Sequence, residues 1–521
     1  MLAAAPRGEA PTLGAAHLSS ATVTVYLVGG GPGDPGLLTV RALDVLERAD
    51  VVVYDRLSQE SLLDLAPPGA ECIDVGKAPG SARLEQEEIN ALLIERGKGG
   101  ATVVRLKGGD PFVFARGGEE AAALAEANVP FEIVPGISSA IAVPAYAGIP
   151  VTMRHSSTSV TIVTGHEDPG SGEEGTVDWR AVAQVGGTIV VLMGVARIGR
   201  IAAALMAGGR SPDTPAAAIQ WGTRPNQRTV RTTLGTIANE ELGTPSVIVI
   251  GEVAALDLSW YEHRPLFGRR VVVTRAREQA SELVSKLDAL GAECVEVPAI
   301  EVREAADGGA ELRRVAGELA GYDWVVLTSP NGARALLVAL RTQGLDARAF
   351  GGCKVAAIGP GTADALAAGN VLVDLVPPQF VAESLVEAFP DAPRGGRDPG
   401  RVLLARAAQA RDVLPDGLRA RGWVVDVVEA YRTMAAPLDD ERRSSLAAAD
   451  VITFTSSSTV TRFLDAAGPE SLPPVVAAIG PITAATAREH GVRVDIEAEV
   501  HSIDGLVDAI LGWAATGPRS G

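Results

Sequence analysis

The chain has 521 residues, of which 47% are hydrophobic and 4% aromatic, and its formal net charge is −18. This length corresponds to about three or four domain-sized units, and the abundance of small aliphatic residues is typical of stacked α/β layers. The negative charge excludes nucleic acid and anionic membrane surfaces as partners, because both need a basic face.

The N-terminal segment, residues 1–21, is rich in alanine but lacks the continuous apolar core of a signal peptide, so we expect a disordered tail. No apolar run in the chain reaches the roughly 18 residues of a membrane-spanning helix. Cys72, Cys294 and Cys353 lie too far apart for a CxxC metal site, and the histidines lack ligand spacing. We therefore predict a cytoplasmic protein with free thiols and no metal ion.

Three loops rich in glycine and proline each follow a strand-like run. The first loop covers residues 29–36, the second covers 107–111 and the third covers 135–140. In an open α/β sheet, loops at the carboxyl ends of parallel strands line the ligand crevice. We therefore expect the three loops to form one pocket for a sizeable small molecule.

Two ionisable side chains follow strand candidates in the same region. Asp55 comes after Val51–Tyr54, and Lys77 comes after Cys72–Val75. An acid and a base that face one crevice could transfer protons. A surface ion pair explains the pattern at least as well.

The first loop contains Gly31-Pro-Gly-Asp-Pro-Gly36, which matches the GxGxxG pattern of dinucleotide-binding proteins. Pro32 and Pro35 have no N–H to donate, and Asp34 would repel a pyrophosphate. A dinucleotide-dependent oxidoreductase is therefore the weaker hypothesis, and a ligand without phosphates suits the loop better. In the second loop, Asp110 is a candidate acceptor for a hydroxyl or cationic group, with an ordinary turn as the alternative.

Further strand candidates follow the third loop. They are Val160–Val163, Thr188–Leu192, Ala216–Gln220 and Ser246–Ile250. We therefore predict two α/β subdomains at about residues 22–137 and 138–260, and a short linker at 261–268.

The remainder of the chain contains an internal repeat. Asp323-Trp-Val-Val-Leu-Thr-Ser329 recurs 127 residues later as Asp450-Val-Ile-Thr-Phe-Thr-Ser456. Ala357-Ile-Gly-Pro-Gly-Thr-Ala363 recurs 121 residues later as Ala478-Ile-Gly-Pro-Ile-Thr-Ala484. Offsets this large indicate two duplicated lobes rather than a solenoid.

We accordingly expect a bilobed α/β domain over residues 269–515, with its ligand between the lobes. Lobe 1 would comprise about residues 269–300 plus 433–515, and lobe 2 about residues 301–432.

Residues 22 to about 260 resemble the tetrapyrrole methylase family, and within it the uroporphyrinogen-III C-methyltransferases. The motifs that carry the resemblance are Val28-Gly-Gly-Gly-Pro-Gly-Asp-Pro-Gly-Leu-Leu-Thr39, Tyr54-Asp-Arg-Leu57, Val75-Gly-Lys77, Arg105-Leu-Lys-Gly-Gly-Asp-Pro-Phe112, Val134-Pro-Gly-Ile-Ser-Ser-Ala140 and Ala145-Tyr-Ala-Gly-Ile-Pro150. One departure is Ser138-Ser139, where the family has Thr-Ala, and this change is conservative.

The resemblance implies a methylase fold of two α/β subdomains that binds S-adenosyl-L-methionine and forms a homodimer. It implies Asp55 as the proton acceptor and Lys77 as the proton donor. The residues that it places in contact with the cofactor are Pro32, Gly108, Gly109, Asp110, Val113, Ser138, Ser139, Met193 and Gly222.

The second half resembles the uroporphyrinogen-III synthase family over about residues 266–515. The matching segments are Thr274-Arg275, the two Gly-Pro-x-Thr-Ala turns, Thr328-Ser-Pro-Asn331, Thr455-Ser-Ser457 and Glu429-Ala-Tyr-Arg-Thr433. Candidate substrate-binding residues at these strand ends are Arg275, Ser329, Thr362, Ser456 and Thr483. Tyr431 is a candidate catalytic residue, whose hydroxyl would assist departure of the substrate hydroxyl, and a hinge residue packed between the lobes is the alternative.

Together the two resemblances imply a bifunctional enzyme. The second half would cyclise hydroxymethylbilane to uroporphyrinogen III without a cofactor, and the first half would methylate that product twice to give precorrin-2. A methyltransferase fused to a non-catalytic tetrapyrrole-binding sensor is the alternative.

Overall fold

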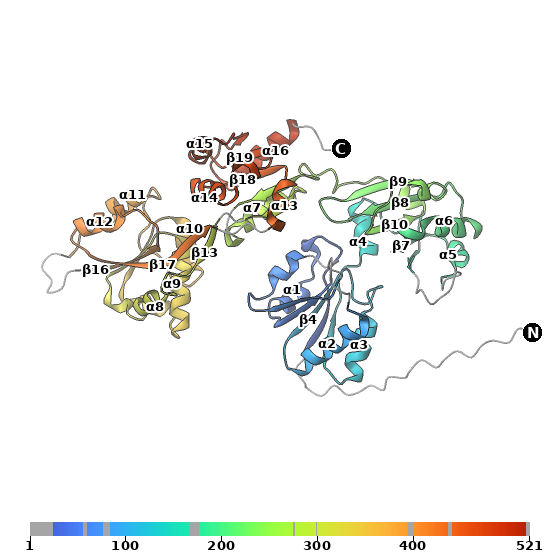
Figure 1. Ribbon diagram of the computed structural model, residues 1–521, viewed down its shortest axis with the longest axis horizontal. Helices are drawn as coiled ribbons and strands as arrows, with labels where there is room; N and C mark the ends of the chain where they lie inside the picture. Colours follow the sequence, from blue (N-terminus) through green and yellow to red (C-terminus); the bar gives the residue numbers. More distant parts are fainter. Residues whose placement is uncertain are drawn as a thin grey trace, which may run out of the picture. The chain divides into compact units, whose positions relative to one another are not determined.

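The computed structural model describes residues 24–55, 60–76, 84–166, 177–274, 277–297, 300–393, 400–435 and 440–516. It divides into two compact units (Figure 1). The first unit ends at Gly268 and also takes in Leu290–Glu293, and the second comprises Arg269–Ala289 and the chain from Cys294 onward. The predicted tail, residues 1–21, lies outside the described residues. In the described ranges no helix is long and apolar enough to cross a membrane.

The predicted α/β class is confirmed, since the described residues form four five-stranded sheets with helices packed against them. The first sheet has the strand order β3-β2-β4-β1-β5, and every neighbouring pair is parallel. Its strands are β1 (Val25–Gly29), β2 (Val51–Tyr54), β3 (Glu71–Asp74), β4 (Val103–Lys107) and β5 (Phe131–Val134).

Helices cover both faces of this first sheet, because its central strands are apolar on both sides. Helix α1 (Val40–Leu46) packs on one face, and α2 (Gln86–Lys98) and α3 (Gly117–Glu126) pack on the other (Figure 1). The faces of the sheet are therefore closed, and a ligand can approach only at an edge.

The second sheet of the first unit has the order β6-β7-β10-β8-β9. Its strands are β6 (Val160–Thr164), β7 (Thr188–Leu192), β8 (Pro215–Gln220), β9 (Arg228–Thr233) and β10 (Ser246–Ile250). Helix α4 (Ser139–Tyr146) packs on one face, and α5 (Trp179–Val185) and α6 (Ile198–Ala207) pack on the other. Strand β10 is antiparallel to both β7 and β8, so these two strands run in the same direction.

Two further sheets form the lobes of the second unit. The lobe 1 sheet has the order β12-β11-β18-β19-β20 and the lobe 2 sheet the order β13-β17-β16-β14-β15. The strands of lobe 1 are β11 (Arg270–Val273), β12 (Glu293–Glu296), β18 (Val451–Phe454), β19 (Val475–Ala478) and β20 (Ile496–Glu497). Those of lobe 2 are β13 (Ile300–Arg303), β14 (Trp324–Leu327), β15 (Lys354–Ala357), β16 (Arg401–Ala407) and β17 (Val424–Ala435).

Helices fill the connections in both lobes. Lobe 1 carries α7 (Arg277–Ala289), α13 (Asp440–Ala447), α14 (Ser457–Ala467), α15 (Pro481–Glu489) and α16 (Ile503–Thr516). Lobe 2 carries α8 (Ala310–Ala316), α9 (Pro330–Thr342), α10 (Pro360–Ala367), α11 (Ala382–Ala388) and α12 (Val413–Ala420). The chain enters lobe 2 through β13 and leaves it through β17, and these two strands pair antiparallel.

The internal repeat extends to individual hydrogen bonds. In lobe 2, the carboxylate of Asp374 accepts a hydrogen bond from the backbone N–H of Val355 at 2.8 Å. In lobe 1, Asp495 accepts one from Val476 at 3.0 Å, and both residues lie 121 positions after their counterparts. The two lobes are therefore two copies of one α/β pattern.

Residues 261–268, which we expected to be a linker, are packed inside the first unit. Tyr261 is 4% exposed and Leu266 is 0% exposed. The ring of Tyr261 lies 5.4 Å from that of Phe267, and its hydroxyl donates to the carbonyl of Thr223 at 3.2 Å. Because charged residues surround them in the sequence, the burial of Tyr261 and Leu266 was not predicted.

Candidate functional site

The order of the first sheet brings the predicted site segments together at one edge. Asp55 follows β2, the second loop follows β4, the first loop follows β1 and the third loop follows β5. These four strands are consecutive neighbours and parallel, so the segments lie side by side at their carboxyl ends. This edge is the candidate site of the first unit.

Glycines allow the three loops to touch. The N–H of Gly31 donates to the carbonyl of Gly109 at 3.2 Å, and the N–H of Gly109 donates back to Gly31 at 2.7 Å. A Cβ atom on Gly136 would lie 2.2 Å from the Gly109 oxygen, and one on Gly29 would lie 2.5 Å from the Cα of Gly136. A side chain at either position would therefore force the loops apart.

Asp110 joins the second loop to the third. Its carboxylate accepts hydrogen bonds from the backbone N–H of Phe112 at 2.8 Å and of Gly136 at 3.1 Å. Beyond this junction, Ser138 caps helix α4 by accepting from the N–H of Ala140 at 3.3 Å. The structure thus gives Asp110 and Ser138 structural tasks, and their predicted contacts with the cofactor stay predictions.

Asp34 connects the first loop to the second subdomain through two hydrogen bonds. Its backbone N–H donates to the Thr223 hydroxyl at 3.0 Å, and its carboxylate accepts from the Tyr146 hydroxyl at 2.6 Å. Burial, with the hydrogen bond to Asp34, raises the pKa of Tyr146. The hydroxyl therefore stays protonated as a donor at neutral pH.

The second sheet supplies the other side of the crevice. Strands β7 and β8 end at the same edge, which places Met193 and Gly222 at that edge. Met193 is 50% exposed, whereas Gly222 is buried and a Cβ there would lie 2.2 Å from the Val143 side chain. Thr223, next to Gly222, reaches across to the first loop, so the two sheet edges face each other.

Asp55 is held by a buried guanidinium. Nη2 of Arg105 lies 3.2 Å from Oδ2 of Asp55, and the two side chains are 3% and 30% exposed. Asp55 is thus half-buried and oriented at the end of β2. Its predicted partner Lys77 lies outside the described residues.

In the second unit, Ser329 and Ser456 occupy equivalent positions. Each follows a strand and caps the next helix, accepting from the N–H of Gly332 at 3.1 Å and of Thr459 at 3.3 Å. The positive end of a helix dipole at these helix starts is suited to carboxylate groups. Arg275, a third predicted residue, lies outside the described residues.

Thr362 and Thr483 are both buried in the synthase unit. Thr362 is 2% exposed and Thr483 is 5% exposed, and their predicted contacts with substrate stay predictions. Both lie in the first turn of a helix that packs on its sheet, and the repeated Gly-Pro-x-Thr-Ala motif therefore serves the fold. Tyr431 is half-buried against the lobe 2 core, which leaves both of its proposed roles open.

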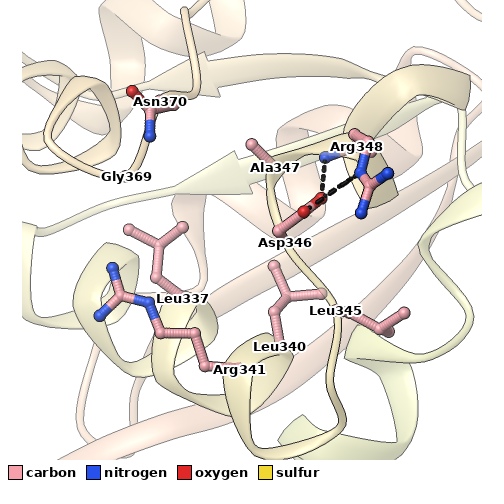
Figure 2. A pocket seen from close by; sticks show the side chains of 9 residues that line it. All are labelled: Leu337, Leu340, Arg341, Leu345, Asp346, Ala347, Arg348, Gly369 and Asn370. Carbon is pink, nitrogen blue, oxygen red and sulfur yellow. Dashed lines mark hydrogen bonds and ion pairs between the residues drawn. The ribbon is translucent and has the colours of Figure 1, made fainter.

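A hollow of about 320 Å³ opens in lobe 2, at the opposite end of α9 from Ser329 (Figure 2). It is lined by Leu337, Leu340, Arg341, Leu345, Asp346, Ala347, Arg348, Gly369 and Asn370. Arg348 pairs with Asp346 at 2.9 Å, and Arg341 lies across the hollow from this pair. None of the predicted substrate residues lines it, so it is separate from the candidate site.

Comparison with known proteins covers both units. The family "Tetrapyrrole (Corrin/Porphyrin) Methylases" matches residues 24–238, and "Uroporphyrinogen-III synthase HemD" matches residues 281–508. Porphyrin biosynthesis protein HemD of Ruminiclostridium josui is 39% identical over 497 residues, which are 94% of this chain and 97% of that protein. The chain belongs to this family of fused tetrapyrrole methylases and uroporphyrinogen-III synthases.

Other relatives match the methylase unit alone. The S-adenosyl-L-methionine-dependent uroporphyrinogen III methyltransferase of Methanosarcina barkeri is 53% identical over 236 residues, 44% of this chain and 92% of that protein. A crystal structure of uroporphyrin-III C-methyl transferase from Thermus thermophilus complexed with S-adenyl homocysteine is 42% identical. It covers 44% of this chain and 98% of that chain, with a TM-score of 0.39.

The crevice of the methylase unit fits S-adenosyl-L-methionine better than a dinucleotide. Pro32 and Pro35 offer no N–H to a pyrophosphate, and the carboxylates of Asp34 and Asp110 border the same loops. Two carboxylates disfavour a diphosphate and favour a ligand with a sulfonium and an ammonium group. Across the described ranges, no group of three or more His, Cys, Asp or Glu side chains is placed to hold a metal ion.

Two functional candidates in the synthase unit were missed at the sequence level. The ring of Phe380 lies over Gly359, where an added Cβ atom would be 3.2 Å from the Cβ atom of Phe380. The ring of His501 lies over Gly480, where an added Cβ atom would be 2.8 Å from Cδ2 of His501. Both rings are exposed, and both pairs are related by the 121-residue offset. The 121-residue offset of the repeated motifs also relates Phe380 to His501, which is the sequence signal that points to this pair.

Proposed function

We propose that this chain closes hydroxymethylbilane to uroporphyrinogen III in its synthase unit and methylates that product twice in its methylase unit, giving precorrin-2. The observation that carries the methylase half is the row of segments along one sheet edge. Asp55 and the three loops follow four adjacent parallel strands, so an acid stands beside the cofactor loops.

When bound, S-adenosyl-L-methionine supplies a methyl group on a positively charged sulfur. Methylation of a pyrrole carbon leaves the ring system positively charged. The ring system must then lose a proton from another position of the conjugated system to become neutral. Asp55, half-buried and oriented by Arg105, is our candidate for the acceptor of that proton. The hydrogen bond between Tyr146 and Asp34 holds the first loop against the second subdomain, which fixes one wall of the candidate site.

Ring closure in the synthase unit requires little more than correct folding of a flexible substrate. Hydroxymethylbilane loses its hydroxyl as water, its last ring turns over, and the new carbon–carbon bond closes the macrocycle. Positioning is the main contribution that a protein makes to such a step. Ser329 and Ser456, one from each lobe, are placed at helix starts where substrate carboxylates would be held.

The proposal is tested by incubating the full chain with hydroxymethylbilane, with and without S-adenosyl-L-methionine. We expect uroporphyrinogen III without the cofactor and precorrin-2 with it. If only the uninverted isomer that forms spontaneously is found, the synthase unit is a binding module, and the sensor hypothesis replaces ours. If supplied uroporphyrinogen III is not methylated, the methylase half of the proposal fails.

We also propose that the chain forms a homodimer through its methylase unit, as the resemblance to the methylase family implies. Light scattering of the full chain should give a mass near twice the 53.6 kDa of one chain. A mass equal to that of one chain at micromolar concentration would contradict this proposal.

A further inference from the structure

A fully buried carboxylate lies behind the candidate site of the methylase unit. Glu120, on helix α3, is 0% exposed, and its Oε1 accepts from Nζ of Lys107 at 2.8 Å, Nε of Arg105 at 3.1 Å and Nε2 of Gln86 at 3.3 Å. Arg105 and Lys107 are each 3% exposed and lie on β4. Two cations therefore converge on one oxygen of a single acid in the interior.

Arg105 is fixed on every side of its guanidinium. Nε contacts Glu120, Nη1 donates to the carbonyls of Leu106 at 3.2 Å and Val53 at 3.4 Å, and Nη2 donates to Asp55 at 3.2 Å. Because the guanidinium is planar and rigid, anchoring one edge determines where the other edge lies. Arg105 therefore links the position of the Asp55 carboxylate to that of the Glu120 carboxylate.

The charges of this cluster balance only when Asp55 is included. Arg105 and Lys107 carry two positive charges and Glu120 one negative charge, so the buried part has a surplus of one positive charge. Burial, followed by the charge of Arg105, lowers the pKa of Lys107, whereas the charges of Glu120 and Asp55 raise it. The carboxylate of Asp55, 30% exposed at the site edge, supplies the missing negative charge.

Stability alone is a poor explanation for such a cluster. Removing several charges from water costs about as much as their attraction returns, and apolar side chains of similar size would serve the core as well or better. What the cluster provides is a fixed orientation for the one member that reaches the crevice.

We propose that Glu120 is a positioning residue for methyl transfer, which acts through Arg105 to hold the Asp55 carboxylate in the orientation that accepts the proton of the methylated ring. This inference rests on the proposed role of Asp55. The rival explanation is a cluster that serves only the packing of α3 on the first sheet.

The test compares Glu120→Gln with wild type in the full chain, using supplied uroporphyrinogen III and S-adenosyl-L-methionine. Glutamine keeps the shape and an acceptor oxygen but removes the charge. We expect kcat for methylation to fall by roughly 10-fold to 10²-fold, the cost of misplacing a reacting group by about 1 Å. KM and the affinity for S-adenosylhomocysteine should stay within a factor of about two, because Glu120 is 0% exposed and its proposed role is in the chemical step.

A control separates positioning from a loss of stability. Leu93 lies in the same core, on the same face of the sheet, and is 0% exposed. Leu93→Ala should lower the melting temperature while kcat at 25 °C changes by less than about two-fold. If Leu93→Ala lowers kcat as much as Glu120→Gln does, the cluster is structural and our inference is overturned.

The decisive measurement is a double-mutant cycle with Asp55→Asn. If Glu120 acts through Asp55, Glu120→Gln should cost almost nothing further in the Asp55→Asn background. An equal loss in both backgrounds contradicts the inference. Full activity of Asp55→Asn alone would instead remove Asp55 as the acceptor, which is a failure of the proposed function and is recognised separately.

Should Glu120→Gln fail to fold, Arg105→Lys provides the second variant. It keeps the charge but loses the planar fork that reaches Asp55. A drop in kcat with unchanged KM supports the inference, and unchanged kcat overturns it.

Discussion

The hydroxyl of Tyr146 lies 2.6 Å from Oδ2 of Asp34, and this hydrogen bond joins helix α4 to the first loop at the candidate site. Tyr146 is further supported by the rings of Trp260 and Tyr261, whose centroids lie 5.0 Å and 4.8 Å from its own. The donor of this hydrogen bond is therefore a rigid aromatic side chain whose position is fixed by its ring contacts.

Replacing Tyr146 with phenylalanine keeps the ring packing and removes the hydrogen bond to Asp34. A hydrogen bond to a charged group contributes about 1.5–3 kcal/mol, and the fraction of this that closes the crevice should appear as weaker binding of S-adenosylhomocysteine, by about 10-fold. Calorimetric titration checks this. Tyr322→Phe in the synthase unit, where burial and Asp426 raise the tyrosine pKa to about 12, is the matched control and should bind normally.

Asp110→Ala should weaken S-adenosylhomocysteine binding and lower the melting temperature together. Both effects are expected because the carboxylate holds the N–H groups of Phe112 and Gly136. Losing an acceptor for two backbone donors costs about 1–3 kcal/mol for each group left unsatisfied. Differential scanning calorimetry and titration on one sample distinguish this from pure ligand contact, which would leave the apo melting temperature unchanged.

Phe380→Ala and His501→Ala should each slow ring closure in the synthase unit. Both rings stand exposed over a glycine at a helix start, where they can pack against a pyrrole ring of the substrate. We expect a several-fold lower rate and a larger share of the uninverted isomer, measured by chromatography of the oxidised products. Leu372→Ala is the control, because Leu372 is an 84% exposed apolar side chain in the lobe that carries Phe380 and is not one of the candidate site residues. Wild-type rates in both ring variants would show that the rings have no part in closure.

The two activities should be separable if the boundary is placed after Gly268. A fragment of residues 1–268 keeps Leu266 and Phe267, which are packed on Tyr261 or buried, and should methylate uroporphyrinogen III. A fragment of residues 1–264 lacks both and should melt at a lower temperature. Equal melting temperatures would indicate that these apolar contacts contribute nothing.

Cys353 should resist alkylation until the pH is high. Burial raises the pKa of its thiol from an ordinary value of 9.0 to about 11, so between these pH values the folded chain keeps a proton that the unfolded chain releases. The contribution of this group to stability is present below pH 9 and is lost as the pH rises towards 11. Iodoacetamide labelling followed by mass spectrometry should give a half-maximal rate near pH 11 in native protein and near pH 9 in urea.

The sequence was sufficient to predict the meeting of the three loops and Asp55, because parallel strands end at one edge and each segment directly follows a strand. The hydrogen bond between Asp34 and Tyr146 could not be predicted in this way, because 112 residues separate the partners and no local pattern links them. The repeated Gly-Pro-x-Thr-Ala motif suggested a ligand role for Thr362 and Thr483, but a buried threonine in the first turn of a helix also contributes to the packing of that helix. The burial of these two side chains favours the second explanation, and a short motif does not determine burial.

The pairing of β13 with β17 has a consequence for how the two lobes are connected. The chain passes into lobe 2 and out of it along two strands bonded to each other, with Ile300 opposite Ala435 and Arg303 opposite Arg432. Because β13 is the edge strand of the lobe 2 sheet, the first and last strands of the lobe lie side by side at one edge. Lobe 2 is thus a closed insertion whose two ends are held together by backbone hydrogen bonds, and it can fold as a unit within the chain of lobe 1.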